Sequence, residues 1–535
     1  MKAKKIFKGM TAAAVAAVLA ASMVPMTAFA AVTADAKSIS VNVPTEYSSK
    51  NVTGTWTAYK VATANPNGNA YDYAWVDGLD TVITDLPTIT EISSTSWAAN
   101  QTKNLAAKLS KAIKDTQNSS FVANLRTYSA NLGVSESLEP GYYVFVVDAQ
   151  MDNNGVKEGL LINPVLREVS DKNSSDLTAK FTTVTVDKSI TGITNGSKDN
   201  SGNIAEGTVG STVNYEIKTA FPTYDKDVKE IEDFIIADQP SANLTIDTST
   251  IKIFNGTNEI PDTNYTLTTN DEDTNYGGKN DGIGFKIVFN DAYVLDNEGA
   301  NIVVRFNANI ANTGNIETKI PNDVQLDYGN DYSTGGGKKT LTDETDVFKT
   351  QLQVEKTTAD GQTPLAGAGF EIYSADTIVV DGADKKITEI TDFDTKYKKV
   401  DNLVYAIDDN NGNILNKKVG NEQTTTEGSN ILTWNLPAGQ YVIHESTVPS
   451  NYKQAGNRLV TITATANSTS TSYTYTKTGF DDDTTNKATI KNVEGQSLPG
   501  TGGMGTIIFT VAGAGVVLVA GIMLIVYMKK RKIEE

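Results

Sequence analysis

Two lysines each follow a short alternation of apolar and polar residues, in Val184-Thr-Val-Asp-Lys188 and in Leu352-Gln-Val-Glu-Lys356. A lysine amine is a nucleophile only when it is neutral, and burial in an apolar core lowers its pKa towards neutrality. A lysine at the end of a strand is more often a solvated edge residue or a snorkelling side chain. Residue type alone does not distinguish a buried nucleophile from a solvated edge residue. The sequence around each lysine is therefore needed to distinguish them.

The neighbourhood of Lys356 favours the chemical role. Pro364-Leu-Ala-Gly-Ala-Gly-Phe-Glu-Ile372 follows it, and two later segments read Leu436-Pro-Ala-Gly-Gln-Tyr-Val-Ile-His-Glu445 and Thr489-Ile-Lys-Asn492. Over nearly all of residues 350–495 this pattern resembles the B-type collagen-adhesin (CnaB-like) module. The resemblance implies that Lys356 attacks the side chain of Asn492 and that Glu445 assists.

The implied reaction has physical requirements that these residue types meet. The amide carbon of asparagine is a poor electrophile, and a carboxylic acid kept protonated by an apolar site can polarise the amide by donating to its oxygen. Ammonia then leaves and an isopeptide bond remains. A bond between the first and last strands of a domain acts like a disulfide across a long loop, a stabilisation of about 4 kcal/mol. The chain has no cysteine, so such bonds would replace disulfides.

A second set of segments surrounds Lys188. They are Val209-Gly-Ser-Thr-Val-Asn-Tyr-Glu-Ile217, Phe234-Ile-Ile-Ala-Asp238-Gln-Pro240 and a predicted closing strand, Pro321-Asn322-Asp-Val-Gln-Leu-Asp-Tyr328. They resemble the longer A-type module of fimbrial subunits, which implies a bond between Lys188 and Asn322 assisted by Asp238. The family's usual Thr-Asp-Thr-Leu is Ala-Asp-Gln-Pro here, and Asn322 could instead belong to a turn. The region before Lys188 offers no such trio, and we predict that it is not cross-linked.

Both ends of the chain carry export signals. Four lysines, an apolar stretch from Thr11 to Val24 and Ala28-Phe29-Ala30 predict a signal peptide over residues 1–30. At the other end, an uncharged run over residues 506–527 is long enough to span a bilayer, and basic residues follow it. A plain single-span anchor is one interpretation of that run.

The pentapeptide Leu498-Pro499-Gly500-Thr501-Gly502 lies just before the apolar run. Pentapeptide, span and basic tail together resemble the LPXTG cell-wall sorting signal of Gram-positive surface proteins. The resemblance implies that a sortase cuts between Thr501 and Gly502 and joins Thr501 to an amine. In major fimbrial subunits that amine is a lysine eight residues before the next domain's bonding lysine, the position of Lys180 here. Thr-Ala replaces the usual Tyr-Pro before it; Lys172 is the neighbouring candidate, and an ordinary linker lysine is the alternative.

Composition narrows the function further. The net charge is -18; the signal peptide contributes four positive charges and the tail a net two, so residues 31–501 carry -24. A protein with this negative charge is not expected to bind nucleic acid, because phosphates repel it. The single histidine argues against a histidine zinc site or a Ser-His hydrolase. We expect no metal and no cofactor.

Strand signals dominate the exported part, and we predict an all-β fold of tandem immunoglobulin-like β-sandwiches in a rod. Ser38-Ile-Ser-Val-Asn-Val43 and Phe181-Thr-Thr-Val-Thr-Val186 alternate, whereas residues 100–114 repeat leucine and isoleucine every four residues and predict a helix that covers a sheet. The predicted divisions are the signal peptide (1–30), an N-terminal pilin domain (31–180), a CnaA-like domain (181–346), a CnaB-like domain (347–495) and the sorting signal with its transmembrane helix (496–535).

The sequence therefore predicts a structural protein rather than an enzyme: the major subunit of a sortase-assembled pilus, anchored to the wall and supporting adhesion. Its expected partners are a class C pilin sortase, a housekeeping sortase, further copies of itself, minor pilins, peptidoglycan and a host or environmental ligand. Two alternatives stay open. One is a wall-anchored adhesin that is never polymerised, and the other is a pilus tip or base subunit.

Overall fold

The structure is a computed structural model that describes residues 34–92, 99–115, 118–151, 157–224, 231–271, 283–329, 338–391, 397–400, 404–407, 414–467 and 471–495. The predicted signal peptide, pentapeptide, apolar span and basic tail lie outside these residues. Two compact units are present, one of residues 1–350 with 465–474 and one of residues 351–464 with 475–535. We divide the described chain into a first region (34–179), a second region (180–350) and a third region (351–495).

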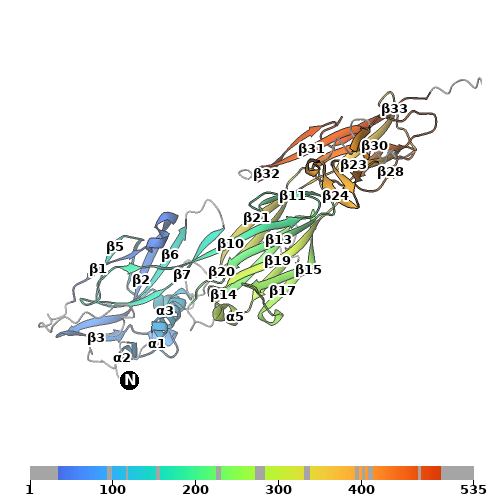
Figure 1. Ribbon diagram of the computed structural model, residues 1–535. Helices are drawn as coiled ribbons and strands as arrows, with labels where there is room; N and C mark the ends of the chain where they lie inside the picture. The colour runs from blue at the N-terminus through green and yellow to red at the C-terminus, as the bar shows by residue number, and fades with distance from the viewer. Residues whose placement is uncertain are drawn as a thin grey trace, which may run out of the picture. The chain divides into compact units, whose positions relative to one another are not determined.

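The first region combines two sheets with a helical layer (Figure 1). One sheet has the strand order β3-β2-β6-β8, with β4 also paired to β2, and the other has the order β5-β1-β9. The elements are β1 (Lys37–Asn42), η1 (Thr45–Lys50), β2 (Val52–Asn67), β3 (Ala70–Trp75), α1 (Leu79–Val82), α2 (Ile89–Ile92), α3 (Ala99–Lys114), α4 (Ser119–Val122), β4 (Thr127–Asn131), β5 (Ser135–Leu138), β6 (Gly141–Met151), β7 (Glu158–Asn163), β8 (Val165–Val169) and β9 (Leu177–Thr178).

Strand β6 shows why this region has two cores. Its residues from Gly141 to Val147 are all buried, although a strand alternates its side chains between two faces. Tyr142 and Val144 pack with the buried face of α3, and Tyr143 and Phe145 pack with β1 and β5. A continuous apolar run is therefore stable here because both faces of the sheet are covered.

The second region is a two-sheet sandwich. The sheet orders are β16-β15-β19-β13-β10-β7 and β11-β12-β21-β20-β14-β18-β17. The elements are β10 (Lys180–Ile193), β11 (Ser197–Lys198), β12 (Ile204–Thr208), β13 (Thr212–Ala220), β14 (Glu232–Pro240), β15 (Leu244–Asn255), β16 (Asn258–Glu259), η3 (Asp262–Asn264), β17 (Tyr265–Asp271), β18 (Ile283–Phe289), α5 (Asp291–Asp296), β19 (Asn301–Ile310), β20 (Ile320–Gly329) and β21 (Lys338–Thr350).

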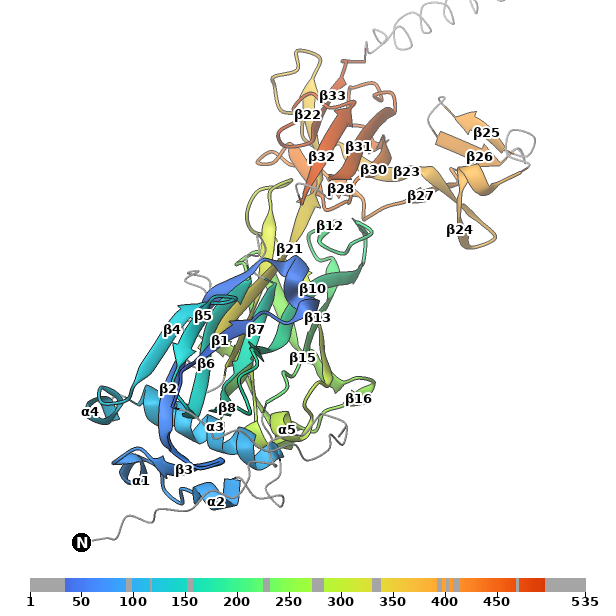
Figure 2. The ribbon, with the colours of Figure 1, turned by 90° about the vertical axis from the view of Figure 1, so that its left-hand side faces the viewer.

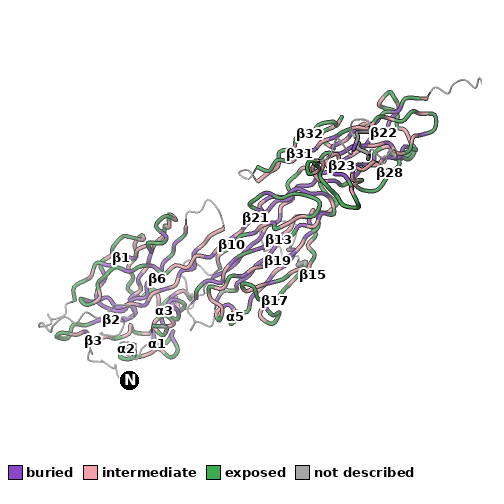
Figure 3. The backbone as a smooth tube through the Cα atoms, viewed as in Figure 1, coloured by how far each residue is buried: buried purple, intermediate pink, exposed green. Residues whose placement is uncertain are grey.

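Apolar and aromatic side chains fill the space between these two sheets, and Figure 3 shows buried positions recurring along β13 and β19. The Phe221 ring meets the rings of Phe234 and Phe289 edge-on, with centroids 5.0 and 5.1 Å apart. The first region also contributes a strand to this sandwich, because β7 pairs with β10 from Lys180 opposite Asn163 to Thr185 opposite Glu158. Residues 158–163 therefore belong by hydrogen bonding to a sheet of the second region.

The third region has a three-stranded sheet, β29-β22-β33, and a second sheet of order β24-β23-β30-β31-β32, with β27 and β28 also paired to β23. Strands β25 and β26 form a separate hairpin (Figure 2). The elements are β22 (Leu352–Thr358), β23 (Gly369–Val380), β24 (Ala383–Lys386), η4 (Ile387–Glu389), β25 (Tyr397–Val400), β26 (Val404–Ile407), β27 (Asn416–Lys418), β28 (Gln423–Thr424), β29 (Ile431–Trp434), β30 (Gly439–Thr447), β31 (Arg458–Asn467), β32 (Ser472–Thr478) and β33 (Lys487–Asn492).

The predicted all-β class and the covering helix, α3, are confirmed. One prediction was wrong: the strand that carries Asn322 does not close the second region, because β21 follows it and pairs with it along ten residues. No helix among the described residues is long and apolar enough to cross a membrane, and the predicted span 506–527 lies outside them.

Candidate functional site: two buried lysine, acid and asparagine groups

Three strands of the third region turn their reactive residues into the core by simple alternation. On β22 the inward row is Leu352, Val354 and Lys356, all fully buried. On β33 the row Ala488 and Ile490 ends in Asn492, and on β30 the row Tyr441 and Ile443 ends in Glu445. Each row is apolar up to its last residue, so folding of the apolar face carries the polar residue inward with it.

Lys356 lies in a site that favours its neutral form. Its Nζ donates to the carbonyls of Thr357 at 2.8 Å and Ile490 at 3.3 Å. Burial lowers the pKa of Lys356 to about 8, and the nearby Glu445 carboxylate opposes that shift. A larger fraction of this amine is therefore neutral at physiological pH than of an ordinary lysine.

The acid and the amide are in direct contact. Nδ2 of Asn492 lies 2.7 Å from Oε1 of Glu445, and the backbone N–H of Ala455 donates to Oε2 of Glu445 at 2.7 Å. Glu445 and Asn492 are 2% and 1% exposed, so water does not compete for either group. Oδ1 of Asn492 is buried and has no hydrogen-bond partner among the described residues.

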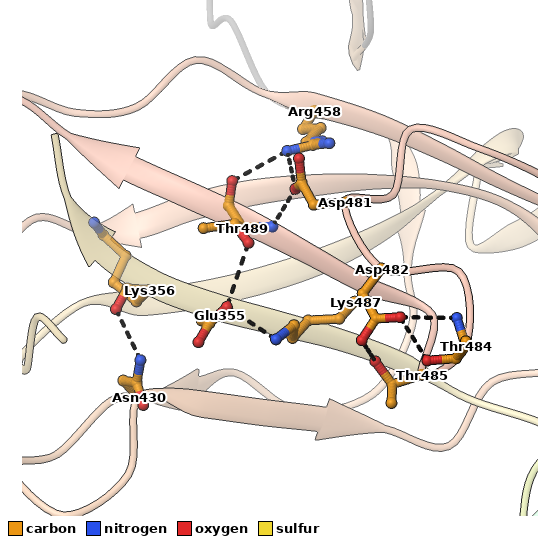
Figure 4. A network of polar contacts seen from close by, with 10 residues as sticks. All are labelled: Glu355, Lys356, Asn430, Arg458, Asp481, Asp482, Thr484, Thr485, Lys487 and Thr489. Carbon is orange, nitrogen blue, oxygen red and sulfur yellow. Dashed lines mark hydrogen bonds and ion pairs between the residues drawn. The ribbon is translucent and has the colours of Figure 1, made fainter. Parts of the chain in front are cut away.

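Strand pairing brings the lysine to the same place. β22 and β33 run parallel, with Lys356 opposite Ile490 and Thr358 opposite Asn492. The backbone of Lys356 is held on its other side by Asn430, which accepts from the Lys356 N–H at 2.8 Å and donates to its carbonyl at 3.3 Å (Figure 4). The structure thus places all three predicted residues of this region on one buried patch.

The opposite face of the same strands carries ordinary polar contacts. Glu355 binds Lys487 at 3.1 Å and accepts from Thr489, and Figure 4 shows these side chains beside β22 and β33. His444 also faces away from the buried patch, since Nδ1 lies 2.7 Å from Oδ1 of Asn457. Its neighbour Glu445 points inward, as strand alternation predicts.

In the second region three strands again supply one residue each. Lys188 comes from β10, and Asp238 and Asn322 come from β14 and β20 of the facing sheet. All three are fully buried. Nζ of Lys188 contacts Oδ2 of Asp238 and donates to the carbonyl of Asp323 at 3.1 Å. Asn322 is paired with Thr345 within the sheet and is not a turn residue.

Burial shifts both titratable groups towards their neutral forms. It lowers the pKa of Lys188, against the opposing charge of Asp238, and it raises the pKa of Asp238 to about 6. Neither side-chain atom of Asn322 that can form a hydrogen bond has a partner within hydrogen-bond distance among the described residues, but its amide lies close enough to Asp238 to lower the pKa of that carboxyl. A neutral amine and a protonated acid are the forms that attack on an amide requires.

The sequence did not point to three further contributors to this site. The rings of Tyr215 and Phe306 lie 5.3 and 5.5 Å from Nζ of Lys188 and supply its low-dielectric wall. Asp343 accepts from the backbone N–H of Lys188 at 2.7 Å and binds Lys157 at 2.7 Å. Tyr215 and Phe306 share a strand face with other apolar residues, as ordinary core residues do. Their spacing therefore does not distinguish them as parts of the site.

The predicted acceptor lysines lie apart from these buried groups. Lys180 is exposed, but it is the first residue of β10, opposite Asn163, and not part of an unpaired linker. Lys172 is also exposed, and its Nζ donates to the carbonyl of Asn69 at 3.2 Å. Within the described ranges no cluster of three or more His, Asp or Glu side chains is placed to hold a metal ion.

Two sequence families match parts of this chain. Residues 350–478 match the SpaA family, described as a prealbumin-like fold domain, and residues 490–535 match the LPXTG cell wall anchor motif. Among curated proteins no sequence match is found. The anchor motif indicates covalent attachment to the cell wall of a Gram-positive bacterium and makes the chain a sortase substrate.

A solved structure of a backbone pilin shares the fold of this chain. The T6 backbone pilin of serotype M6 Streptococcus pyogenes aligns with a TM-score of 0.51 and 13% identity over 86% of this chain and 98% of that chain. The major pilins SpaD and SpaA of Corynebacterium diphtheriae align with TM-scores of 0.47 and 0.42, at 13% and 15% identity, over 86% of this chain and 97% and 100% of theirs. The chain thus combines a pilin-like backbone-subunit fold with a wall anchor motif.

Proposed function

We propose that this protein is the major subunit of a sortase-assembled pilus. A class C pilin sortase would join Thr501 of one subunit to Lys180 of the next, and a housekeeping sortase would attach the finished polymer to peptidoglycan. Two internal bonds, Lys188–Asn322 and Lys356–Asn492, stiffen each subunit. The protein is structural, since each internal bond forms once per molecule and does not turn over.

One observation carries this proposal: a chain with a wall anchor motif holds two buried groups of lysine, acid and asparagine, one in each of two successive sandwiches. Burying a charged lysine is costly unless it is paired or neutralised. Burial of a lysine in both sandwiches is explained if each buried amine reacts, because the bond it forms stabilises the domain. Each reaction releases ammonia and lowers the mass by about 17 Da.

The third-region bond suits a subunit that bears tension. Lys356 lies on β22, where the chain enters this region, and Asn492 lies on β33, where the chain leaves it. A covalent link between these strands carries a pulling force from entry to exit without loading the rest of the sandwich. That property is useful in a polymer of such subunits, and less useful in a solitary wall protein.

The test is an immunoblot of wall extracts boiled in detergent, with Lys180→Ala and Lys172→Ala as a matched pair and Thr501→Ala as the attachment control. We expect a ladder of covalent multimers in the native strain that collapses to monomer in Lys180→Ala and persists in Lys172→Ala. The reverse pattern would move the acceptor to Lys172. A single band in the native strain would contradict polymerisation and favour a solitary adhesin.

A further inference from the structure

A loop that follows β30 holds the acid of the third-region site at two points. The side chain of Gln454 donates to the backbone carbonyl of Glu445 at 2.7 Å. The next residue, Ala455, donates its backbone N–H to Oε2 of Glu445, also at 2.7 Å. The acid is thus held both by its main chain and by one of its two carboxyl oxygens.

The same loop holds the chain that follows the asparagine. The N–H of Lys453 donates to the carbonyl of Val493 at 2.9 Å, and the N–H of Gly495 donates to the carbonyl of Asn451 at 2.7 Å. Tyr452 forms an isolated bridge with Glu494. Residues 451–455, which we call the clamp loop, therefore bind Glu445 with one end and the three residues after Asn492 with the other.

We propose that the clamp loop is the positioning element for the Lys356–Asn492 bond, holding Glu445 against the Asn492 amide and directing its proton to the oxygen that faces this amide. The inference rests on the proposed bond chemistry and adds a role for residues outside the reacting trio. Gln454 and Ala455 act through Glu445, to which both are hydrogen-bonded.

A neutral carboxylic acid has one hydroxyl donor and one carbonyl acceptor. The Ala455 N–H occupies Oε2 as a donor, so in the neutral acid Oε2 is the acceptor and Oε1 carries the proton. Oε1 is the oxygen 2.7 Å from the Asn492 amide. A half turn of this amide about its Cβ–Cγ bond places Oδ1, which is buried without a hydrogen-bond partner among the described residues, on that proton.

The proposed reaction conserves atoms and protons. Neutral Lys356 attacks Cγ of Asn492 with its lone pair, the new Nζ–Cγ bond forms and the Cγ–Nδ2 bond breaks. One proton of Nζ passes through Glu445 to Nδ2, which leaves as ammonia. Glu445 ends with the proton count with which it began, so the clamp loop needs to hold one geometry throughout.

The experiment synthesises the full chain in a cell-free system and samples it over time. After digestion, mass spectrometry measures the Lys356–Asn492 and Lys188–Asn322 cross-linked peptides in each sample. Ala455→Pro removes the N–H donor, and Ala455→Gly keeps it as the matched conservative variant. Gln454→Ala removes the side-chain contact, and Lys453→Ala, in the same loop, leaves all the backbone contacts in place. The second-region bond is the internal reference in every sample.

We expect Ala455→Pro to slow third-region bond formation by about tenfold and Gln454→Ala by about threefold. Ala455→Gly and Lys453→Ala stay close to the native rate, and the second-region bond is unchanged in all variants. Unfolding of each variant in the Asn492→Ala background, where no third-region bond forms, separates folding from positioning. Gln454→Ala carries the test if Ala455→Pro does not fold.

Two results would overturn the inference, and they are distinguishable. Native rates in both Ala455→Pro and Gln454→Ala, with both bonds forming in the native chain, would reject the clamp loop and leave the proposed function intact. A native chain that folds and forms neither bond would reject the bond chemistry itself, and the clamp loop with it.

Discussion

The second-region and third-region sites contain the same residue types but differ in which pair is in contact. In the second region the acid, Asp238, contacts the lysine, and the side-chain amide of Asn322 has no hydrogen-bond partner among the described residues. In the third region the acid, Glu445, contacts the asparagine, and the amine of Lys356 donates to backbone carbonyls. The acid is therefore hydrogen-bonded to the nucleophile in one site and to the electrophile in the other.

This difference implies two routes to the same neutral amine. Lys188 can pass its proton directly to Asp238, and burial favours that transfer because it disfavours both charges. Among the described residues, Nζ of Lys356 donates to two carbonyls and to no carboxylate, so this amine loses its proton by another path. The second site is thus self-contained in its proton balance, and the third site depends more on the pH of its surroundings.

The largest expected effect comes from removing the acid that contacts the lysine. In the unbonded Asn322→Ala background, Asp238→Ala leaves the amine of Lys188 buried without its acid and should destabilise the second region by about 3–5 kcal/mol. In the matched Asn492→Ala background, Glu445→Ala leaves Lys356 with its carbonyl acceptors and should cost the third region about 1–3 kcal/mol. Hydrogen exchange of peptides from β10 and β22 gives the opening free energy of each region. Equal losses would mean that the two contacts are energetically alike.

The second largest effect on stability is expected from loss of a proposed isopeptide bond. Asn492→Ala in an otherwise native chain should lower the stability of the third region by about 4 kcal/mol, because the proposed bond would join its first and last strands. Asn322→Ala should destabilise only the second region. Intact mass is the independent check: the native exported region should lie about 34 Da below its sequence mass, and either variant about 17 Da below its own. A native chain at full sequence mass would reject both tethers.

Much of each site follows from alternation in the sequence. Leu352, Val354 and Lys356 share one strand face. Burial of the two apolar residues therefore predicts that the lysine is buried as well. The contacts made by backbone groups were not predictable, because the N–H of Ala455 has no residue signature and its partner lies ten residues earlier. Strand β21 was also not predicted, because the resemblance named residues 321–328 as the closing strand, whereas the chain returns to pair with β20 along β21.

The rates of the two bonds should respond differently to pH. The third-region rate should follow the neutral fraction of Lys356, because only the neutral amine attacks and burial lowers the pKa of this lysine to about 8. The amine is protonated below its pKa, so this rate should fall about tenfold for each pH unit well below 8. The second-region rate should change less, because Asp238 takes the proton of Lys188 within the site.

The measurement is the ratio of the two cross-linked peptides in full-length chains synthesised and then held at pH 6, 7, 8 and 9. Since both proposed bonds lie in one molecule, differences in synthesis cancel in the ratio. A ratio that does not change with pH would show that the third site also passes its proton internally, from Lys356 to Glu445. The contrast between the two sites would then be one of contact geometry alone.

The smallest effect is expected on the outer face of the third-region strands. Glu355 and Lys487 form an ion pair at 3.1 Å whose side chains are 23% and 22% exposed. An ion pair of this exposure is screened by water and contributes less than about 1 kcal/mol. Glu355→Gln should therefore shift the urea midpoint of the third region only slightly and leave the Lys356–Asn492 bond complete by mass. An incomplete bond in this variant would mean that the outer face also positions β33, and that the buried patch and the clamp loop do not hold Asn492 by themselves.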